Sequence, residues 1–217
     1  GQSISWPYPK ELVGRITFAL EDEEIIEAIS LINDSLQKLV VENSYYIRLN
    51  RIEDQEGMAR IKVDCWQDTY KNIIDQSYLD SLNYEIQTNK YIDSFDEYKN
   101  MVLVAEDVND HKIIGYSCFS TDANEYADAE LISLYIDKNY SRRGVGTSLL
   151  RETIKELKKY NKKTLMLWCI KENKNAIKFY EKMGGIKAFD KMAKIGNKVY
   201  QEAFRRLEDL YRELQAD

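Results

Sequence analysis

The stretch between residues 131 and 183 constrains the fold more than any other part of the chain, because strand and helix patterns alternate in it over short distances. The apolar run Thr164–Ile170 has the composition of a strand that is covered on both faces. The helix after it stops at Gly184-Gly185, a pair that suits a helix C-cap. In chain order, the predicted elements are a strand at Leu131–Ile136, a helix with Leu150, Ile154 and Leu157 on one face, the strand Thr164–Ile170, and a helix at about Lys174–Met183. This order predicts an α/β protein.

The flanking segments add further strands and helices to this unit. Met101–Glu106 and Ile113–Ser120 alternate in strand fashion, and the polar turn Val108–Lys112 joins them as a β-hairpin. The other predicted elements are a strand at Tyr46–Ile52, a helix with Met58, Ile61, Cys65 and Trp66 facing inward, helical stretches at Ser77–Leu82 and about Asn83–Tyr98, and closing strands near Ile186–Lys194 and Lys198–Arg205. Together these elements predict a mixed sheet with helices.

Residues 1–43 are interpreted as a separate N-terminal extension, with two helices over residues 9–41. The second helix carries an apolar stripe made by Ile25, Ile29, Ile32, Leu36 and Leu39. Either the main domain or a second copy of the chain must cover this stripe, so a homodimer is one hypothesis. Residues 44–217 form the principal domain in this interpretation. The chain of 217 residues is 44% hydrophobic, which is enough to fill the core of one domain.

Composition argues against several classes of partner. The sequence has no run of eighteen uncharged apolar residues, and its N-terminus lacks the pattern of a signal peptide. We therefore expect a cytoplasmic protein without a membrane partner. The net charge is −6, and residues 1–43 supply most of it, with eight acidic against three basic residues. The remainder is close to neutral, which argues against a nucleic-acid-binding surface.

The cysteines and the single histidine argue against metal and triad chemistry. Cys65, Cys118 and Cys169 are too widely spaced for a disulfide framework or a CxxC zinc site, so we expect reduced thiols and no metal. His111 lies in the predicted hairpin turn, where a solvated side chain is expected. Chemistry that needs a Ser-His-Asp triad or several histidine ligands is therefore disfavoured.

A glycine-rich turn follows the strand Leu131–Ile136 and opens the next helix, with the sequence Arg142-Arg143-Gly144-Val145-Gly146-Thr147. Glycines let a ligand approach the main chain closely, and the free N–H groups of a helix's first turn attract a diphosphate. A tight connection without any ligand explains these residues equally well. The turn is neither a P-loop, since no Gly-Lys-Ser/Thr follows, nor the GxGxxG of dinucleotide folds.

A second motif runs from Asn173 to Gly185, with the sequence Asn-Lys-Asn-Ala-Ile-Lys-Phe-Tyr-Glu-Lys-Met-Gly-Gly. Taken alone, it is a short helix that packs on the sheet. The glycine turn and this helix, with one strand between them, together resemble the two signature motifs of the GNAT superfamily of N-acetyltransferases. The stretches Val63–Ile74 and Tyr78–Leu82 look like the first two helices of many bacterial members. The resemblance covers about residues 45–207.

The resemblance implies the GNAT acyl-CoA N-acyltransferase fold, with acetyl-coenzyme A (acetyl-CoA) as cosubstrate. In this fold a mixed, mostly antiparallel sheet splays open between its fourth and fifth strands, here Leu131–Ile136 and Thr164–Ile170. The pantetheine arm lies in that gap. The residues implied to bind the cofactor are Leu134 and Ile136 through their main chain, Asn175 and Tyr180 beside the arm and its sulfur, and the diphosphate-binding N–H groups of Arg142, Arg143, Gly144, Val145, Gly146 and Thr147. Ser141 departs from the Gln or Arg that the family prefers there, which puts one side-chain contact in doubt.

The resemblance also suggests the catalytic groups. An alkylammonium with a pKa of about 10.4 must lose a proton before it attacks a thioester, so acetyl transfer needs a base. Glu130 occupies a position where relatives often carry that base. The alternative interpretation is an exposed carboxylate at a strand end without a catalytic role. Tyr180 is positioned to protonate the departing thiolate. The alternative interpretation is an ordinary tyrosine of an amphipathic helix. Main-chain N–H groups of the splayed strand are expected to stabilise the oxyanion.

Three functions remain open at this point. We expect an N-acetyltransferase that acts on the primary amine of a small molecule. The first alternative is an enzyme of the same fold that acetylates a protein N-terminus or a lysine, and nothing in the acceptor region separates the two. The second is a sensor or interaction module that binds coenzyme A without turnover, which the presence of both Glu130 and Tyr180 disfavours.

Overall fold

The computed structural model describes residues 44–98 and 101–207. The N-terminal extension of residues 1–43, with its two predicted helices, lies outside the described residues. In chain order, the described elements are β1 (Tyr45–Leu49), η1 (Ile52–Asp54), α3 (Gln55–Thr69), α4 (Gln76–Asp80), α5 (Tyr84–Asp93), α6 (Phe95–Tyr98), β2 (Val102–Asp107), β3 (Ile113–Ser120), β4 (Ala129–Ile136), η2 (Lys138–Tyr140), α7 (Val145–Lys159), β5 (Leu165–Ile170), α8 (Lys174–Lys182), β6 (Ile186–Ile195) and β7 (Lys198–Leu207).

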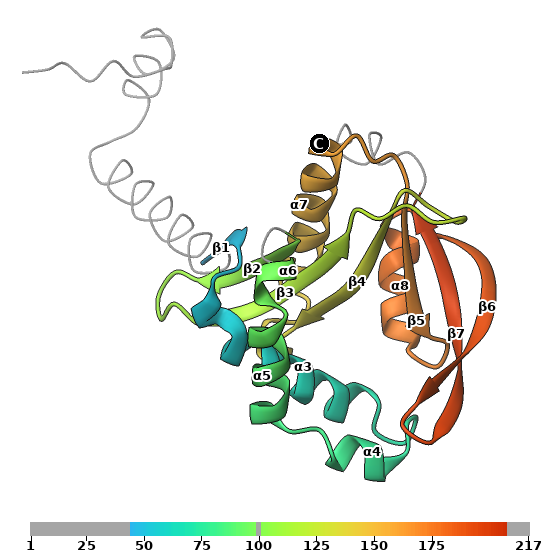
Figure 1. Cartoon of the computed structure of the whole chain (residues 1–217), viewed down its shortest axis with the longest axis horizontal. Helices are drawn as coiled ribbons and strands as arrows, with labels where there is room; N and C mark the ends of the chain where they lie inside the picture. The colour runs from blue at the N-terminus through green and yellow to red at the C-terminus, as the bar shows by residue number, and fades with distance from the viewer. Residues whose placement is uncertain (1–43, 99–100, 208–217) are drawn as a thin grey trace, which may run out of the picture. The chain divides into compact units, whose positions relative to one another are not determined.

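The described strands form one sheet in the order β1-β2-β3-β4-β5-β7-β6 (Figure 1). Only β4 and β5 run parallel to each other, and all other neighbours are antiparallel. The parallel pair is connected through α7, as a crossover between parallel strands requires. The prediction of a mixed, mostly antiparallel sheet is therefore confirmed.

β4 and β5 lie side by side at only one end. They pair over Ala129–Leu131 and Leu165–Leu167, while the rest of β4 pairs with β3 alone. Figure 1 shows the two strands moving apart beyond the paired end. The register between β3 and β4 skips Ile132, whose side chain is 50% exposed. Because such a bulge inserts a residue and bends its strand, the divergence begins at Ile132, and the predicted splay between the fourth and fifth strands is confirmed.

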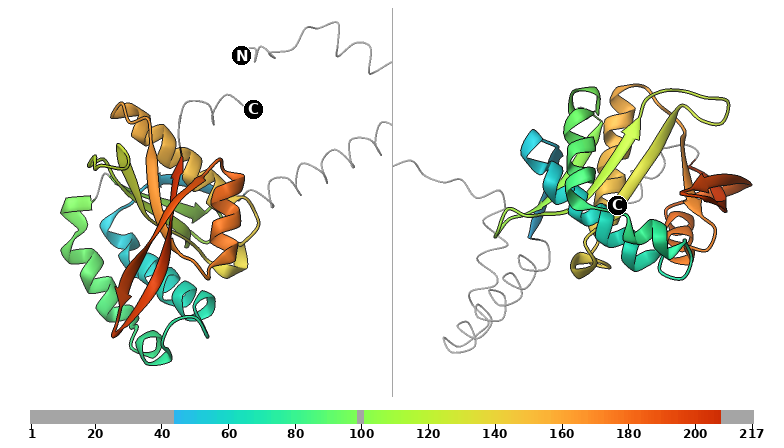
Figure 2. Two further views of the ribbon diagram at one scale, coloured as in Figure 1. Left: turned by 90° about the vertical axis from the view of Figure 1, so that its right-hand side faces the viewer. Right: turned by 60° about the horizontal axis from the view of Figure 1, so that its bottom comes forward.

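Helices cover both faces of the sheet (Figure 2). On one face, α7 and α8 pack against the middle strands, and Leu150, Ile154 and Leu157 of α7 are fully buried there, as their spacing predicts. On the other face, α3 and α5 cover β2 to β4 through a cluster that includes Met58, Ile61, Val102, Val104 and Tyr116. The sheet thus lies between these two apolar clusters, and β4 and β5 separate between them.

Several element boundaries differ from the sequence prediction; for example, β4 begins at Ala129 rather than Leu131, and β7 ends at Leu207 rather than Arg205. The strand predicted over Tyr46–Ile52 ends at Leu49, because the Asp54 carboxylate accepts a hydrogen bond from the Arg51 N–H and turns the chain into α3. The helix predicted over about Asn83–Tyr98 is divided into α5 and α6 at Ser94. The Ser94 hydroxyl donates to the Lys90 carbonyl and competes with the helix's own main-chain bonds.

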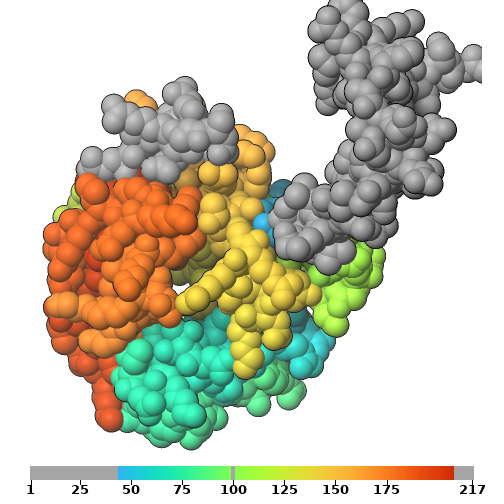
Figure 3. Space-filling view, turned by 180° about the vertical axis from the view of Figure 1, so that it is seen from behind, coloured from blue at the N-terminus to red at the C-terminus, as the bar shows by residue number. Residues whose placement is uncertain are grey.

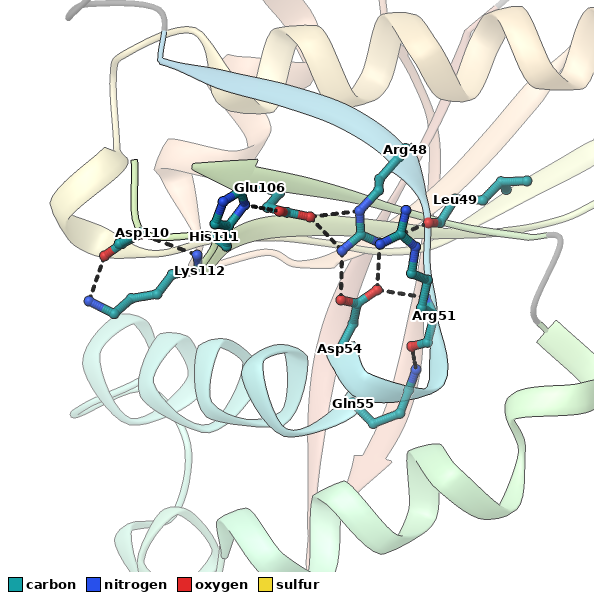
Figure 4. Close-up of polar contacts among 9 residues, drawn as sticks. All are labelled: Arg48, Leu49, Arg51, Asp54, Gln55, Glu106, Asp110, His111 and Lys112. Atoms are coloured by element: carbon teal, nitrogen blue, oxygen red, sulfur yellow. Dashed lines mark hydrogen bonds and ion pairs between the residues drawn. The ribbon is translucent and has the colours of Figure 1, made fainter. Parts of the chain in front are cut away.

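A buried ion network ties β1 to the start of α3 and to the β2–β3 hairpin (Figure 4). The Arg48 guanidinium lies 2.7 Å from the Asp54 carboxylate and 2.6 Å from that of Glu106, and both carboxylates are only 6% exposed. Burial raises the pKa of Glu106, but hydrogen bonds with Tyr46, His111 and Arg48 outweigh it and lower the pKa to about 2. His111 lies at the predicted turn with its side chain 73% exposed, yet its Nδ1 is 2.8 Å from Glu106, so it is not merely a solvated turn residue.

Candidate active site

A cleft of about 640 Å³ lies where β4 and β5 separate. Figure 3 shows an opening there, bounded by the yellow segment before α7, the orange α8 and the blue-green α3–α4 region. The cleft is lined from both faces of the sheet, because Leu131 and Tyr180 belong to the α7–α8 side and Tyr70 packs with α4 on the other. The residues that line it include Cys65, Thr69, Tyr70, residues 131–136, Ser141, Arg142, Gly144, Gly146, Thr147, Trp168, Cys169, Asn173, Asn175, Lys178, Phe179, Tyr180 and Lys182.

The glycine-rich turn forms one wall of this cleft. Gly144 is the N-cap of α7 and has a φ of +85°, a conformation that only glycine adopts at little cost. The first main-chain bond of the helix in this region runs from the Ser148 N–H to the Gly144 carbonyl. The N–H groups of Val145, Gly146 and Thr147 therefore precede the helical ladder, and an anion at this end of the cleft would meet three donors and the positive end of the helix dipole.

Side chains of the turn contribute unequally. Arg142 lines the cleft and has a φ of +62°. Arg143 does not line it, and its guanidinium lies 5.3 Å from the centre of the Tyr140 ring. Val145 is buried in the α7 core. Of the six predicted phosphate-binding residues, Arg142, Gly144, Gly146 and Thr147 border the cleft, whereas Arg143 and Val145 do not.

The free edge of β4 forms a second wall. The Asp137 N–H donates to the Ile114 carbonyl of β3. Because main-chain groups alternate in direction along an antiparallel strand, those of Leu134 and Ile136 point away from β3 and toward the gap. The Cys65 thiol donates to the Ile136 carbonyl over 3.1 Å, and burial raises the pKa of this thiol to about 11, which keeps it protonated. The main-chain groups that were predicted to pair with a pantetheine arm thus border the cleft.

The helix α8 forms the third wall, and its ends are well defined. The Asn173 side chain accepts a hydrogen bond from the Ala176 N–H and caps the N-terminus. At the other end, the Gly184 and Gly185 N–H groups donate to the Glu181 and Tyr180 carbonyls, the pattern of a Schellman motif. The predicted helix and its glycine stop are therefore confirmed. This rigid support holds Tyr180 in the cleft wall.

Tyr180 is buried beside Cys169, and burial raises the pKa of its hydroxyl, followed by smaller effects of Cys169 and Tyr70. The hydroxyl is therefore protonated at neutral pH, and burial makes it a weaker acid than an exposed tyrosine. Tyr70 faces the same cleft from the end of α3, and its hydroxyl accepts a 3.4 Å hydrogen bond from the Asn173 side chain. Sequence reasoning did not predict a role in the site for Tyr70 or Asn173, although Tyr70 lies in the stretch Val63–Ile74 and Asn173 begins the second motif.

Two lysines that sequence reasoning also missed line the cleft on α8. Lys178 and Lys182 are spaced four residues apart, so they share one face of the helix, and Asn175 lies on the exposed part of the same wall. Together with Arg142 they make the cleft wall cationic. The spacing of these lysines in the sequence was the available signal, but it is common on solvated helices.

Glu130 is not among the residues that line the cleft. It lies in the paired end of β4, opposite Met166 of β5 and next to Leu131, which does line the cleft. Burial raises the pKa of Glu130, Lys191 acts in the opposite direction, and Glu202 raises the pKa slightly. The pKa of this carboxyl thus lies above the ordinary glutamate value, and the residue lies at the margin of the cleft rather than within it.

Over residues 44–98 and 101–207, no helix is both long and apolar enough to span a membrane. In the same part of the chain, no three His, Cys, Asp or Glu side chains are grouped so that they could hold a metal ion.

Comparisons with known proteins agree with this geometry. Residues 60–185 match the model of the family described as the Acetyltransferase (GNAT) family. The uncharacterized N-acetyltransferase YuaI of Bacillus subtilis (strain 168) is 30% identical over 141 residues, which are 62% of this chain and 76% of YuaI.

Solved structures share the fold. The PaiA N-acetyltransferase from Thermoplasma acidophilum, in complex with coenzyme A, superposes with a TM-score of 0.59 at 25% identity, covering 76% of this chain and 99% of PaiA. The structure of yncA from Salmonella typhimurium with acetyl-CoA, at 18% identity and a TM-score of 0.55, covers 76% of this chain and 94% of yncA and agrees in fold. With a family match over more than half of its length and a relative matched over three-quarters of that relative, the chain belongs to the Acetyltransferase (GNAT) family of enzymes.

Proposed function

We propose that this protein transfers the acetyl group of acetyl-CoA to the primary amine of a small molecule. The observation that carries the proposal is the cleft itself, which runs from the first turn of α7 into the gap between β4 and β5. Its volume of about 640 Å³ falls within the range of about 300–1,000 Å³ that is typical of ligand sites. The similar proteins PaiA and yncA hold coenzyme A and acetyl-CoA, respectively.

The residues of the cleft fit the chemistry of this cosubstrate. The N–H groups of Val145, Gly146 and Thr147 would bind the diphosphate, with Arg142 beside them. Lys178 and Lys182 would lie near further phosphate oxygens. The outward main-chain groups of Leu134 and Ile136 would pair with the amides of the pantetheine arm, and Asn175 would contact the arm. The Ser141 hydroxyl lines the cleft where the family prefers a longer side chain, so the main-chain donors carry more of the phosphate binding here.

Acetyl-CoA supplies an acetyl group that is activated as a thioester. Glu130 takes one proton from the acceptor's ammonium group, directly or through water, and leaves a neutral amine that forms the new C–N bond. Tyr180 donates its proton to the sulfur as the C–S bond breaks. After the C–N bond has formed, the nitrogen loses a second proton, which returns to the Tyr180 hydroxyl. Main-chain N–H groups on the free edge of β4 hold the carbonyl oxygen as it gains charge. One proton is released to solvent in each turnover.

We also propose a cytoplasmic location. Its support is that Cys65, Cys118 and Cys169 are all free thiols, as expected in a reducing compartment. The homodimer hypothesis rests on the apolar stripe of residues 25–39 alone, and removal of residues 1–43 followed by a measurement of mass in solution tests it.

An acceptor screen tests the proposed function. Free coenzyme A is followed with a thiol reagent across a panel of amines, beside the variants Glu130→Gln and Tyr180→Phe. We expect at least one small amine to give turnover that depends on both residues. Coenzyme A binding, measured by calorimetry, should persist in both variants. Coenzyme A binding without thiol release on any amine would favour a sensor, and unchanged turnover in both variants would show that the catalytic groups are wrong.

A further inference from the structure

The ammonium group of a lysine lies on an aromatic ring at the cleft. The Nζ of Lys191, on β6, is 3.7 Å from the centre of the Trp168 ring of β5. The same Nζ is 3.6 Å from a carboxylate oxygen of Glu202 on β7. Trp168 lines the cleft. The protein therefore presents a cation on an indole face, at the edge of the proposed active site.

Neighbouring rings fix the orientation of this indole. Phe204 and Phe189 meet it edge to face, with ring centres 4.9 and 5.6 Å away, and they stack on each other at 4.8 Å. Tyr126 packs against both phenylalanines. These rings hold the indole in place, the Lys191 ammonium already lies over it, and indole is the most favourable side chain for contact with a cation.

The position of this site relates it to the reaction. Trp168 follows directly after Leu165–Leu167, the part of β5 that pairs with β4, so it stands where the two strands separate. Lys191 and Glu202 both act on the titration of Glu130, the proposed base. The ammonium of Lys191, the indole and two carboxylates thus gather beside the point where an amine would reach the gap.

Lys191 is not firmly held at this site. Its side chain is 44% exposed, and a separation of 3.6 Å from Glu202 is long for an ion pair. Because the lysine is exposed and the separation is long, this pair contributes little to stability, so a second cation can replace the lysine at small cost. Glu202, in contrast, is only 19% exposed and would stay in position.

We propose that the face of Trp168, together with Glu202, is the binding site for the acceptor. The acceptor enters as a primary alkylammonium and takes the place of the Lys191 ammonium over the indole. The proposal rests on the proposed function and specifies its acceptor as a cation. The rival arrangement is an anionic acceptor held by Lys191. It is disfavoured because an anion would approach an ammonium that Glu202 already neutralises, with the Glu130 carboxylate nearby.

Direct binding of a simple probe tests the proposal without turnover. n-Butylammonium is titrated into the full chain, with n-butanol as its neutral counterpart, and the indole N–H signal of Trp168 is followed by NMR after assignment with Trp168→Phe. We expect n-butylammonium, and not n-butanol, to shift this signal. Lys191→Met removes the competing cation and should strengthen n-butylammonium binding by about threefold to tenfold. Lys194→Met removes the same charge from the same strand, away from Trp168, and should leave binding unchanged.

Other outcomes overturn the proposal. Equal binding of n-butanol, or weaker n-butylammonium binding in Lys191→Met, would show that the indole face is not a cation site. Tighter binding of butyrate than of n-butylammonium, lost in Lys191→Met, would establish the anionic rival. Coenzyme A is titrated separately by calorimetry. A lack of coenzyme A binding would remove the proposed function while leaving the probe result as a measurement of the cation site alone.

Discussion

The substitution Gly146→Ala should have opposite effects on two properties: the free energy of unfolding should rise, and the affinity for the cosubstrate should fall. Gly146 lies in the first turn of α7 and lines the cleft, and its φ is not in the left-handed region. A Cβ built there would lie 3.7 Å from the side chains of Ile136 and Phe179, which is an ordinary van der Waals distance. Gly146→Ala therefore introduces no clash into the free protein.

The free energy of unfolding should rise in this variant. Replacing glycine by alanine at a compatible helical position stabilises a protein by about 0.4–1 kcal/mol, mainly because the unfolded chain loses freedom. For a protein of this size, that corresponds to a Tm higher by about 1–4 °C. The same methyl group would occupy space in the cleft wall beside Ile136 and Phe179, where we expect it to hinder the approach of a diphosphate to the N–H groups of the turn. We expect the affinity for coenzyme A to fall by at least about tenfold, equivalent to 1.4 kcal/mol.

Differential scanning calorimetry and isothermal titration of coenzyme A measure the two effects on the same samples. Gly144→Ala is the matched control, because the φ of +85° at Gly144 imposes a backbone cost of about 1–2 kcal/mol on alanine. That variant should melt at a lower temperature than the native protein, in contrast to Gly146→Ala. Unchanged coenzyme A affinity in Gly146→Ala would refute the reasoning, as would a lowered Tm.

Three further predictions concern charged groups. Glu130→Gln should lower kcat by about 10²–10⁴-fold and remove the acid limb of its pH profile, which in the native enzyme lies above the range of an ordinary glutamate because burial raises the pKa of Glu130; a persisting limb would assign the base elsewhere. Arg48→Met leaves two buried carboxylates without their cation and should cost about 3 kcal/mol or more in urea unfolding, whereas Arg60→Met, in an exposed pair, should cost less than about 1 kcal/mol. Glu106 has a folded pKa of about 2 against an ordinary value of 4.5, so its contribution to stability is present above pH 4.5 and is lost as the pH falls toward 2; the urea midpoint should therefore drop less over this range in Glu106→Gln than in the native protein.

The sequence was informative where local patterns determine local structure. The spacing of Leu150, Ile154 and Leu157 identified the buried face of α7, and the glycines at 184 and 185 located the end of α8. Both features depend on geometry within a few residues, namely the period of the helix and the left-handed conformation at its end. The resemblance to a family supplied the splay of the sheet, which no local pattern indicates.

The direction of individual side chains could not be predicted in the same way. The bulge at Ile132 changes which residues of β4 face each side of the sheet. The sequence around Ile132 carries no signal that indicates a bulge. Glu130, which was predicted as the base from its position at the start of the strand, lies in the paired end of β4 at the margin of the cleft. The contact between Lys191 and Trp168 joins β6 to β5, so it depends on tertiary packing alone.

A crystal structure with acetyl-CoA tests the central claim most directly. The diphosphate should lie within hydrogen-bond distance of the N–H groups of Val145, Gly146 and Thr147, with the pantetheine arm between β4 and β5 along Leu134 and Ile136. Acetyl-CoA bound elsewhere on the protein, or an empty turn at saturating acetyl-CoA, would contradict the account.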